Sequence, residues 1–524
     1  MFAKRFMVVV AILLLTCNVF LSAQPTSNLK GVEAPAPAHN TVTYVNSESG
    51  YTTHEATSNH TDPIWIAYDP TNGYMYATSG GASVYYYNSL NNTRMGTIEV
   101  AGAQFWGIVY DSYNGNMYAT SRTNNEVFEI SSSNNTIIKS ISCGYFPQAI
   151  AYNPANHGIY VSNYYGDSVS VINSINNSVV KTIKTGAPDG MAYDPVSGNM
   201  YLEQYTPNGG TEPGYVTVIN STTNEVTDNI SVGNYPTGIA YIPANGDIYV
   251  ANGLSSNISV ISPSSNKVID TINGVYGPVG VTYDPSDGLI YVSATSSIGL
   301  MHIINPYQNT VIISFIVGSN SGDYGWNCAY DPTNMEVYMG RETGMTFIPS
   351  YYAINFKETG LPYGIMWNVT LEGIKKNSTT NEITFYEPEG TYEFSISNLT
   401  AYYDLNNKTL VTMNGNNLTE EVQFMHYAFI TGTISPGSAE LKINGKDVNV
   451  NNGTFNVSVA GGNYNISASS LGYFSFYDKL SVSPGEKKSL NISLNLGLSY
   501  IIIGSAVIIF ASLAAVVYVK RRRR

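Results

Sequence analysis

The chain has 524 residues, of which only 12% are charged, and its 24 Lys and Arg face 37 Asp and Glu for a formal net charge of −13. Seven of the basic residues lie at the two termini, at Lys4, Arg5 and residues 520–524; without them 17 positive charges face 37 negative ones, a net charge of −20. This acidic balance argues against nucleic acid as a partner, and the length accommodates several domains.

The start of the chain predicts export. Lys4 and Arg5 precede an apolar run over residues 7–15, and the small residues Ser22 and Ala23 follow. This order is typical of a secretory signal peptide, which we assign to residues 1–23. Residues 24–39 contain three prolines and predict a flexible lead-in.

A repeat of 41–48 residues occupies residues 40–349. Seven anchor tyrosines mark its copies: Tyr68, Tyr110, Tyr152, Tyr193, Tyr241, Tyr283 and Tyr330. Each is followed eight residues later by a second tyrosine: Tyr76, Tyr118, Tyr160, Tyr201, Tyr249, Tyr291 and Tyr338. Short apolar and alternating segments around these positions predict four strands per copy, which is typical of a β-propeller blade.

A turn follows each anchor tyrosine. Four copies begin it with Asp-Pro, as at Asp69, and five place a glycine five residues after the tyrosine, as at Gly73, where we expect a positive φ. The aspartates could instead be metal ligands. We interpret them as turn residues because Asn153 and Ile242 replace the aspartate without disturbing the frame.

The ring is predicted to close through the N-terminal part of the chain. Six copies carry an asparagine just before their fourth strand: Asn92, Asn135, Asn177, Asn224, Asn266 and Asn309. The seventh copy lacks this segment, whereas residues 40–45 match the segment that begins at Asn309. We therefore expect residues 40–45 to complete the last blade of a closed seven-bladed ring, which leaves no exposed sheet edge.

These repeats resemble the YVTN-type β-propeller family, at Tyr160-Val161-Ser162-Asn163 and Tyr249-Val250-Ala251-Asn252 and in the units that begin at Pro236 and Pro278. The resemblance covers about residues 40–349 and implies the propeller fold. It does not specify a function, because such propellers serve surface layers, binding proteins and some enzymes.

Two smaller all-β units follow the repeats. Residues 350–427, which include Trp367, resemble β-sandwich modules appended to secreted proteins of acidophilic archaea, including thermopsin-type proteases; no stretch matches a protease domain. Residues 428–495, with Gly461-Gly462-Asn463-Tyr464, resemble PEGA-like or carboxypeptidase-regulatory-like sandwiches, which serve as stalks.

The end of the chain predicts a membrane anchor. Residues 500–519 carry no charge and are long enough to cross a bilayer, so we assign a transmembrane helix to residues 496–519. The basic residues 520–524 follow at once, and the positive-inside rule places them in the cytoplasm. The predicted protein is a single-pass membrane protein with its N-terminal part outside the cell.

No catalytic or metal-binding pattern stands out. The six histidines are scattered, and no phosphate-binding loop or nucleophile motif is present, so we predict no catalytic residue, metal or cofactor. The exported part contains many Asn-x-Ser/Thr sequences, which predict glycosylation. The selected glycosylation candidates are Asn59, Asn91, Asn134, Asn257, Asn368, Asn398 and Asn465.

The best candidate for a binding site is a position four residues before each anchor tyrosine, which varies while its surroundings stay constant. Its residues are Ile64, Trp106, Gln148, Asp189, Thr237, Val279 and Trp326. On a propeller this position enters the innermost strand near the channel mouth. Trp106, Gln148, Asp189, Thr237 and Trp326 would suit a sugar or short peptide by stacking and hydrogen bonding. Alternatively, the tryptophans plug the channel or pack between blades.

We expect a non-enzymatic cell-surface protein that displays the propeller on a β-sandwich stalk and binds glycans or envelope proteins. Two alternatives are a secreted lactonase- or glycosidase-like enzyme that uses channel carboxylates, and a purely structural component of the envelope. A surface rich in hydroxyl and amide groups, which do not titrate in acid, favours an acidic exterior.

Overall fold

The structure is a computed structural model that describes residues 44–45, 54–57, 63–205, 212–295, 299–317, 324–342, 344–397, 399–406 and 408–497. These residues form β-strands and one 3₁₀ turn, η1 (Tyr164–Gly166), so the described chain is all-β, as expected. The chain divides into two compact units, Met1–Tyr352 and Ala353–Arg524.

The predicted signal peptide, the lead-in and residues 498–524 lie outside the described residues. In the described ranges, no helix has the length and apolarity that a membrane crossing requires.

The repeats of the first unit each form an antiparallel sheet, and the described residues make seven such sheets. The first sheet contains β3 (Trp65–Asp69), β4 (Tyr74–Thr78), β5 (Ser83–Asn88) and β6 (Thr93–Glu99). The second contains β7 (Phe105–Asp111), β8 (Asn116–Ser121), β9 (Glu126–Ser131) and β10 (Thr136–Ser142). The third contains β11 (Pro147–Asn153), β12 (Gly158–Asn163), β13 (Ser168–Asn173) and β14 (Ser178–Lys184). The fourth contains β15 (Ala187–Tyr193), β16 (Asn199–Tyr205), β17 (Pro213–Asn220) and β18 (Glu225–Asn234).

The last three sheets follow the same order. The fifth contains β19 (Pro236–Ile242), β20 (Asp247–Asn252), β21 (Asn257–Ser262) and β22 (Lys267–Asn273). The sixth contains β23 (Pro278–Asp284), β24 (Leu289–Ala294), β25 (Leu300–Asn305) and β26 (Thr310–Ile316). The seventh contains β27 (Gly325–Asp331), β28 (Glu336–Arg341) and β29 (Gly344–Pro349).

An N-terminal strand does complete the seventh sheet, but it is not the predicted one. β2 (His54–Thr57) pairs antiparallel with β29, whereas β1 (Tyr44–Val45), from the predicted closing segment, pairs parallel with β26 of the sixth sheet. Chain length explains the difference. In the other sheets, one residue (235) to eight residues (317–324) join an outermost strand to the next innermost strand. Residues 58–64 give β2 a link of seven residues, whereas a strand that ends at Val45 would need nineteen, residues 46–64.

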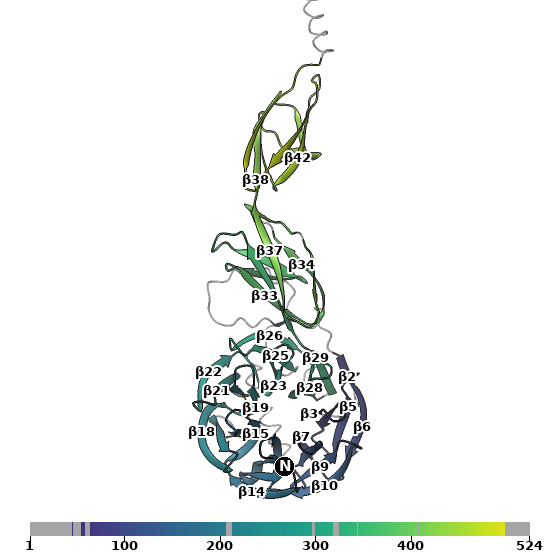
Figure 1. Cartoon of the computed structure of the whole chain (residues 1–524), viewed down its shortest axis with the longest axis vertical. Coiled ribbons are helices and arrows are strands. Elements are labelled where there is room, and N and C mark those ends of the chain that lie inside the picture. Colours follow the sequence, from purple (N-terminus) through teal and green to yellow (C-terminus); the bar gives the residue numbers. More distant parts are fainter. Residues whose placement is uncertain are drawn as a thin grey trace, which may run out of the picture. The chain divides into compact units, whose positions relative to one another are not determined.

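The innermost strands of consecutive sheets lie side by side, from β3 through β7, β11, β15, β19 and β23 to β27. β27 of the last sheet also contacts β3 of the first. Figure 1 shows the seven sheets set around a common centre, with these strands on the inside. The arrangement is propeller-like and brings seven equivalent positions, far apart in sequence, to the same centre.

The apolar core lies between the sheets. Each of several buried clusters draws its side chains from two consecutive sheets; Phe105 and Met117 of the second sheet, for example, pack with Tyr76 of the first. Another cluster joins Tyr338 and Phe347 of the seventh sheet to Ile66 of the first. One sheet alone has two apolar faces, so stacking on both sides is what removes them from water.

The repeated polar residues also join the sheets. The second tyrosine of one sheet donates its hydroxyl hydrogen to the Oδ1 atom of an asparagine in the next, as Tyr118 does to Asn177 at 3.0 Å and Tyr160 to Asn224 at 2.6 Å. Tyr338 of the seventh sheet donates in the same way to Asn92 of the first. The six asparagines have positive φ values between 49° and 58°, which asparagine tolerates well.

The turns after the anchor tyrosines have the predicted structure. The Oδ1 atoms of Asp69, Asp111 and Asp331 each accept a hydrogen bond from the backbone N–H two residues later, at 2.8–2.9 Å. Gly73 and Gly115 have φ values of 71° and 74°. The turn interpretation of these residues is confirmed.

The second unit contains four further sheets in its described residues. Two are formed by β30 (Tyr352–Thr359), β31 (Trp367–Leu371), β32 (Ile374–Ser378), β33 (Glu382–Glu387), β34 (Gly390–Ile396), β35 (Tyr402–Asp404), β36 (Leu410–Met413) and β37 (Leu418–His426). Trp367 and Phe394 of one sheet contact Phe424 and Phe356 of the other, with ring centroids 6.1 and 4.8 Å apart. The two sheets therefore face each other across an aromatic core.

The last two sheets are formed by β38 (Ala428–Ser435), β39 (Glu440–Ile443), β40 (Lys446–Val448), β41 (Thr454–Val459), β42 (Gly462–Ser469), β43 (Phe476–Val482) and β44 (Lys487–Ser493). A single cluster of buried residues, including Ile430, Leu441 and Ile466, joins them. We call this part, residues 428–497, the second module.

Candidate functional site

The seven predicted positions lie together at one end of the sheets. Trp106, Gln148, Asp189, Thr237 and Trp326 each occupy the second or third residue of an innermost strand. We call the end at which the innermost strands begin the entry end. The repeat thus places these residues at equivalent positions of their innermost strands.

An aromatic and cationic contact forms at the entry end. The rings of Trp106 and Trp326 meet edge to face, with centroids 6.4 Å apart and an interplanar angle of 75°. The guanidinium group of Arg122 lies over the ring of Trp106, 3.0 Å from its centroid, and 4.9 Å from the centroid of Phe146. Trp106 is buried, and a desolvated cation–π contact of this kind is worth about 2 kcal/mol.

A chain of buried hydrogen bonds continues from Arg122 across three sheets. Arg122 donates to Oε1 of Gln148, and Nε2 of Gln148 donates to Oδ1 of Asp189. Tyr205 donates its hydroxyl hydrogen to Oδ2 of Asp189. Arg122, Gln148 and Asp189 are all at least 92% buried, so this chain is a fixed element of the entry end.

A second carboxyl group lies beside Asp189. Oε1 of Glu203 accepts a hydrogen bond of 2.9 Å from the backbone N–H of Gly190, and among the described residues Oε2 has no hydrogen-bond partner. Burial raises the pKa of Glu203 well above its ordinary value, and the neighbouring charge of Asp189 raises it further. Burial also raises the pKa of Asp189, against the effect of Tyr205, Gln148 and Arg122.

Burial lowers the pKa of Arg122 to about 9, although Asp189 opposes this shift. At neutral pH, Arg122 is therefore a cation that pairs through Gln148 with a largely buried acidic group.

Aromatic rings surround this network. Tyr205 contacts Tyr235 and Tyr164, with centroids 4.6 and 5.7 Å apart, and Phe146 contacts Tyr165 at 4.6 Å. Tyr165 is 43% exposed, so part of this cluster faces solvent.

The structure separates Thr237 from this group. Its hydroxyl donates to the backbone oxygen of Pro278 in the next sheet, at 2.7 Å. Of the five predicted binding residues, Trp106, Gln148, Asp189 and Trp326 are therefore joined by contacts, and Thr237 has a hydrogen bond between sheets.

Sequence reasoning missed Arg122 and Tyr205, although a signal for them exists. They lie four residues after a second tyrosine, where the seven copies have very different residues: Gly80, Arg122, Tyr164, Tyr205, Gly253, Thr295 and Glu342. The residues before the anchor tyrosines were identified because they vary between copies while their neighbours do not. The same criterion identifies the position four residues after the second tyrosine.

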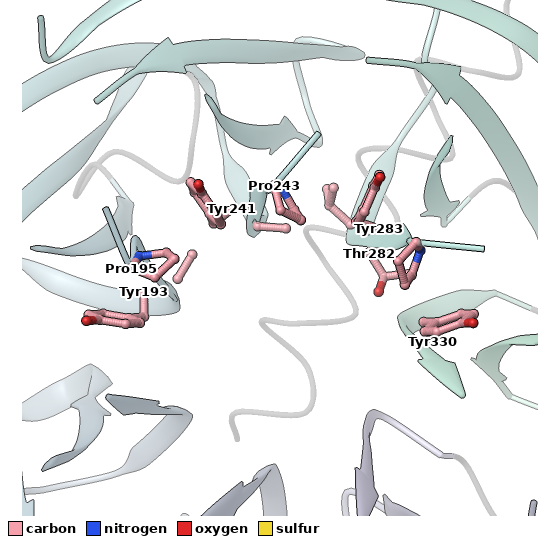
Figure 2. A pocket seen from close by; sticks show the side chains of 11 residues that line it. Tyr193, Pro195, Tyr241, Pro243, Thr282, Tyr283 and Tyr330 are labelled. Carbon is pink, nitrogen blue, oxygen red and sulfur yellow. The ribbon is translucent and has the colours of Figure 1, made fainter. Parts of the chain in front are cut away.

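The opposite end of the innermost strands carries a pocket of about 580 Å³ that the sequence analysis did not predict. Tyr193, Tyr241, Tyr283 and Tyr330 line it, one from each of four consecutive sheets, and Figure 2 shows them in an arc around the opening. The remaining lining residues are Ala192, Pro195, Ala240, Pro243, Val281, Thr282 and Pro285. We call this site the tyrosine pocket.

The chemistry of the tyrosine pocket is neutral. Its lining contains no charged residue, and burial raises the pKa of each of the four phenols, which therefore stay protonated. The pocket offers aromatic faces, proline rings and hydroxyl groups. Such a surface can stack on flat apolar faces and exchange hydrogen bonds with polar edges.

Three glycosylation candidates, Asn91, Asn134 and Asn465, have exposed side chains, whereas Asn257 and Asn368 are half-buried. Asn59 and Asn398 lie outside the described residues. Within the described ranges, no three His, Cys, Asp or Glu side chains lie close enough to hold a metal ion together.

No known protein family and no curated protein matches this chain. A solved structure of hydrazine synthase from Kuenenia stuttgartiensis is similar, with 15% identity and a TM-score of 0.48 over 56% of this chain and 97% of that one. At this level of similarity it assigns no function to the chain.

Proposed function

We propose that this protein is a non-enzymatic recognition protein of the cell surface, in which a closed seven-bladed propeller binds neutral glycans of the envelope through the tyrosine pocket. In this proposal, residues 353–497 form a stalk of two β-sandwiches, and residues 500–519 anchor it in the membrane with residues 520–524 in the cytoplasm. Leu496 and Gly497, which the sequence assigned to the anchor, belong to the stalk, where Leu496 forms a β-bridge with Tyr473. The signal peptide and the order of the segments support export and anchoring.

Closure of the ring is supported by contacts between the last and first sheets. They include strand contact between β27 and β3, the shared apolar cluster and the hydrogen bond from Tyr338 to Asn92. Tyr68 of the first sheet also shares a hydrogen bond of 2.7 Å with Thr333 of the seventh. These contacts repeat those between other neighbouring sheets, which supports closure of the ring.

The tyrosine pocket is the observation that carries the binding function. A pyranose ring has an apolar face that stacks on tyrosine and hydroxyl groups at its edge that hydrogen-bond to phenols and to Thr282. The absence of charged groups among the lining residues favours an uncharged saccharide. Four rings at equivalent positions in successive sheets would accommodate several sugar units.

A glycan-array screen of the full-length protein in nanodiscs tests this proposal. The variants Tyr241→Ala and Tyr283→Ala should each weaken binding about tenfold, which corresponds to about 1.4 kcal/mol. Tyr113→Ala is the matched control, because Tyr113 is 52% exposed and lies in a turn at the same end, outside the pocket lining. Binding that survives both pocket variants and disappears in Trp326→Ala would move the site to the entry end.

An enzymatic function is the second candidate, because Gln148, Asp189 and Glu203 converge at the entry end. Access argues against it: Asp189 is 6% exposed and Glu203 fully buried, and both oxygens of Asp189 already accept hydrogen bonds. Hydrolysis of a lactone or glycoside by the wild-type protein that is lost in Asp189→Asn would establish the enzyme and overturn the binding proposal.

A further inference from the structure

Three large apolar side chains are exposed at one end of the second module. Leu471 is 88% exposed, Phe474 56% and Leu496 48%. They come from the β42–β43 connection and from the segment after β44. We call this surface the module tip.

The tip is also the place where the chain leaves the module. The N–H of Gly497, the last described residue, donates to the oxygen of Gly472 at 2.7 Å. The N–H of Phe474 donates to the oxygen of Asn495 at 2.9 Å, and Tyr473 forms a β-bridge with Leu496. The exposed side chains are thus tied by backbone hydrogen bonds to the exit point of the chain.

The three segments of the tip carry no charge, although the exposed Glu440 lies beside them, paired with Ser469 at the start of β39. Residues 435–439, 470–475 and 494–497, which meet at the tip, contain no charged residue. Leu494 N–H donates to the oxygen of Ser435, which places the first of these segments beside the last. Glu486 and Lys487 lie at the other end, where β38 and β44 begin.

We propose that the module tip rests on the lipid bilayer and inserts Leu471, Phe474 and Leu496 into its interfacial region. This inference rests on the proposed membrane anchor. The uncharged stretch 500–519 starts three residues after Gly497, a distance of at most about 10 Å along an extended chain.

Geometry and solvation then favour insertion. If residues 500–519 cross the membrane, the tip lies within reach of the headgroup region, which takes up apolar side chains to a depth of about 5–10 Å. Moving exposed leucine and phenylalanine side chains out of water is favourable, and the tip segments themselves carry no charge. The module would then have a fixed orientation on the membrane surface.

The test places a fluorophore at the tip of the full-length protein. Leu471→Cys is labelled with an NBD maleimide in nanodiscs of phosphatidylcholine, with and without brominated acyl chains. Asn463→Cys is the control, because Asn463 is exposed at the opposite end of β42 in the same module. Burial raises the pKa of Cys143 and of Cys328 to about 12, which slows their reaction with maleimide, and the labelled parent protein gives the blank.

We expect blue-shifted emission and quenching by brominated lipid at position 471 and neither at position 463. In the Leu496→Cys variant labelled with the same fluorophore, quenching by brominated lipid should fall at least twofold when Leu471→Glu and Phe474→Glu are added. The two carboxylates would keep the module tip out of the membrane interface. The same two substitutions lie at exposed positions and should not unfold the module.

Carbonate extraction separates this inference from the anchor. Protein that stays in the membrane but shows no quenching at 471 and 496 overturns the tip contact alone. Protein that carbonate releases overturns the anchor and the tip contact together.

Discussion

The hydroxyl group of the second tyrosine is the repeated polar link of the first unit. Tyr160 donates to Asn224 of the next sheet and accepts from Nδ2 of Asn156 at 3.1 Å. Both bonds lie in a largely buried environment, where an unsatisfied partner is costly. The tyrosine and the two asparagines therefore act as one unit between sheets.

Tyr160→Phe removes only this hydroxyl and should lower the free energy of unfolding by about 1–3 kcal/mol, because Oδ1 of Asn224 loses this donor and Nδ2 of Asn156 keeps only its bond to the oxygen of Ser221. Guanidinium unfolding followed by circular dichroism measures the change. Tyr145→Phe, at a residue that is 60% exposed, should change little. Equal effects of the two substitutions would contradict the role of the hydroxyl.

Glu203 stands where other copies have a hydroxyl group. Thr120 accepts a hydrogen bond from the N–H of Gly107 in its own sheet and donates one to the oxygen of Gln148 in the next, at 2.8 and 2.7 Å. Thr78 and Ser293 make the same donation to the oxygens of Trp106 and Trp326. Because Glu203 accepts from Gly190 in the same way, a protonated Oε2 would supply the missing donor.

Glu203→Gln keeps one acceptor and gains permanent donor hydrogens. Because the pKa of Glu203 is raised in the folded state, protonation of this carboxyl stabilises the fold. This contribution to stability is complete below the unfolded-state pKa near 4.5 and is lost as the pH rises toward the folded-state pKa. We expect the melting temperature of Glu203→Gln to exceed that of the wild type at pH 7 and to match it at pH 4. A variant less stable than the wild type at both values would refute protonation of this carboxyl.

At the scale of elements, β2 completes the seventh sheet by antiparallel pairing with β29. Without β2, the N–H and C=O groups of β29 would form an exposed edge in the last sheet, which invites pairing with another molecule.

Deleting residues 54–57 should therefore lower stability by about 2–4 kcal/mol, from the loss of a few backbone hydrogen bonds, and promote oligomers. Deleting residues 44–45, which pair with β26 over two positions only, should have a smaller effect. Differential scanning calorimetry and size-exclusion chromatography report both properties. Equal stability of the two deletions would argue against closure by β2.

At the scale of the whole molecule, the repeated links between sheets combine neutral and acidic side chains. Neutral tyrosine and asparagine side chains bond to each other. Asn92, Asn177 and Asn309 also donate to the carboxylates of Glu336, Glu129 and Asp270 in a neighbouring sheet, at 2.7–2.9 Å. Several buried carboxyl groups also have raised pKa values: burial, with a smaller contribution from Asp284, raises that of Asp287 to about 7, and burial raises that of Glu387 to about 7.

This predicts tolerance of acid. A raised carboxyl pKa means that the folded state binds the proton more tightly than the unfolded state does. Protonation of these carboxyl groups therefore adds fully to the free energy of unfolding below the unfolded-state pKa near 4, and this stabilisation is lost as the pH approaches 7. The melting temperature at pH 3–4 should equal or exceed that at pH 7. Calorimetric scans across this range provide the check, and a fall of more than about 10 °C at pH 3 would contradict it.

Local patterns were sufficient to predict much of the fold. The tyrosine spacing, the Asp69-type turns and the glycines after them each act within a few residues, so the sequence shows them directly. The repeat also predicts that Trp106, Gln148 and Asp189 lie at equivalent positions in their sheets, because copies of one repeat place corresponding residues in corresponding positions.

The choice among distant partners depended on the tertiary structure. The repeat predicted that an N-terminal strand closes the last sheet, but connection length selected residues 54–57 in place of 40–45. The link from Arg122 to Asp189 and the tyrosine pocket join residues from three or four sheets, and periodicity does not show which copies meet. The sequence by itself determined each sheet and its turns, because these contacts are local; the tertiary structure decided the strand that closes the last sheet and the sites, because these depend on how separate sheets stack.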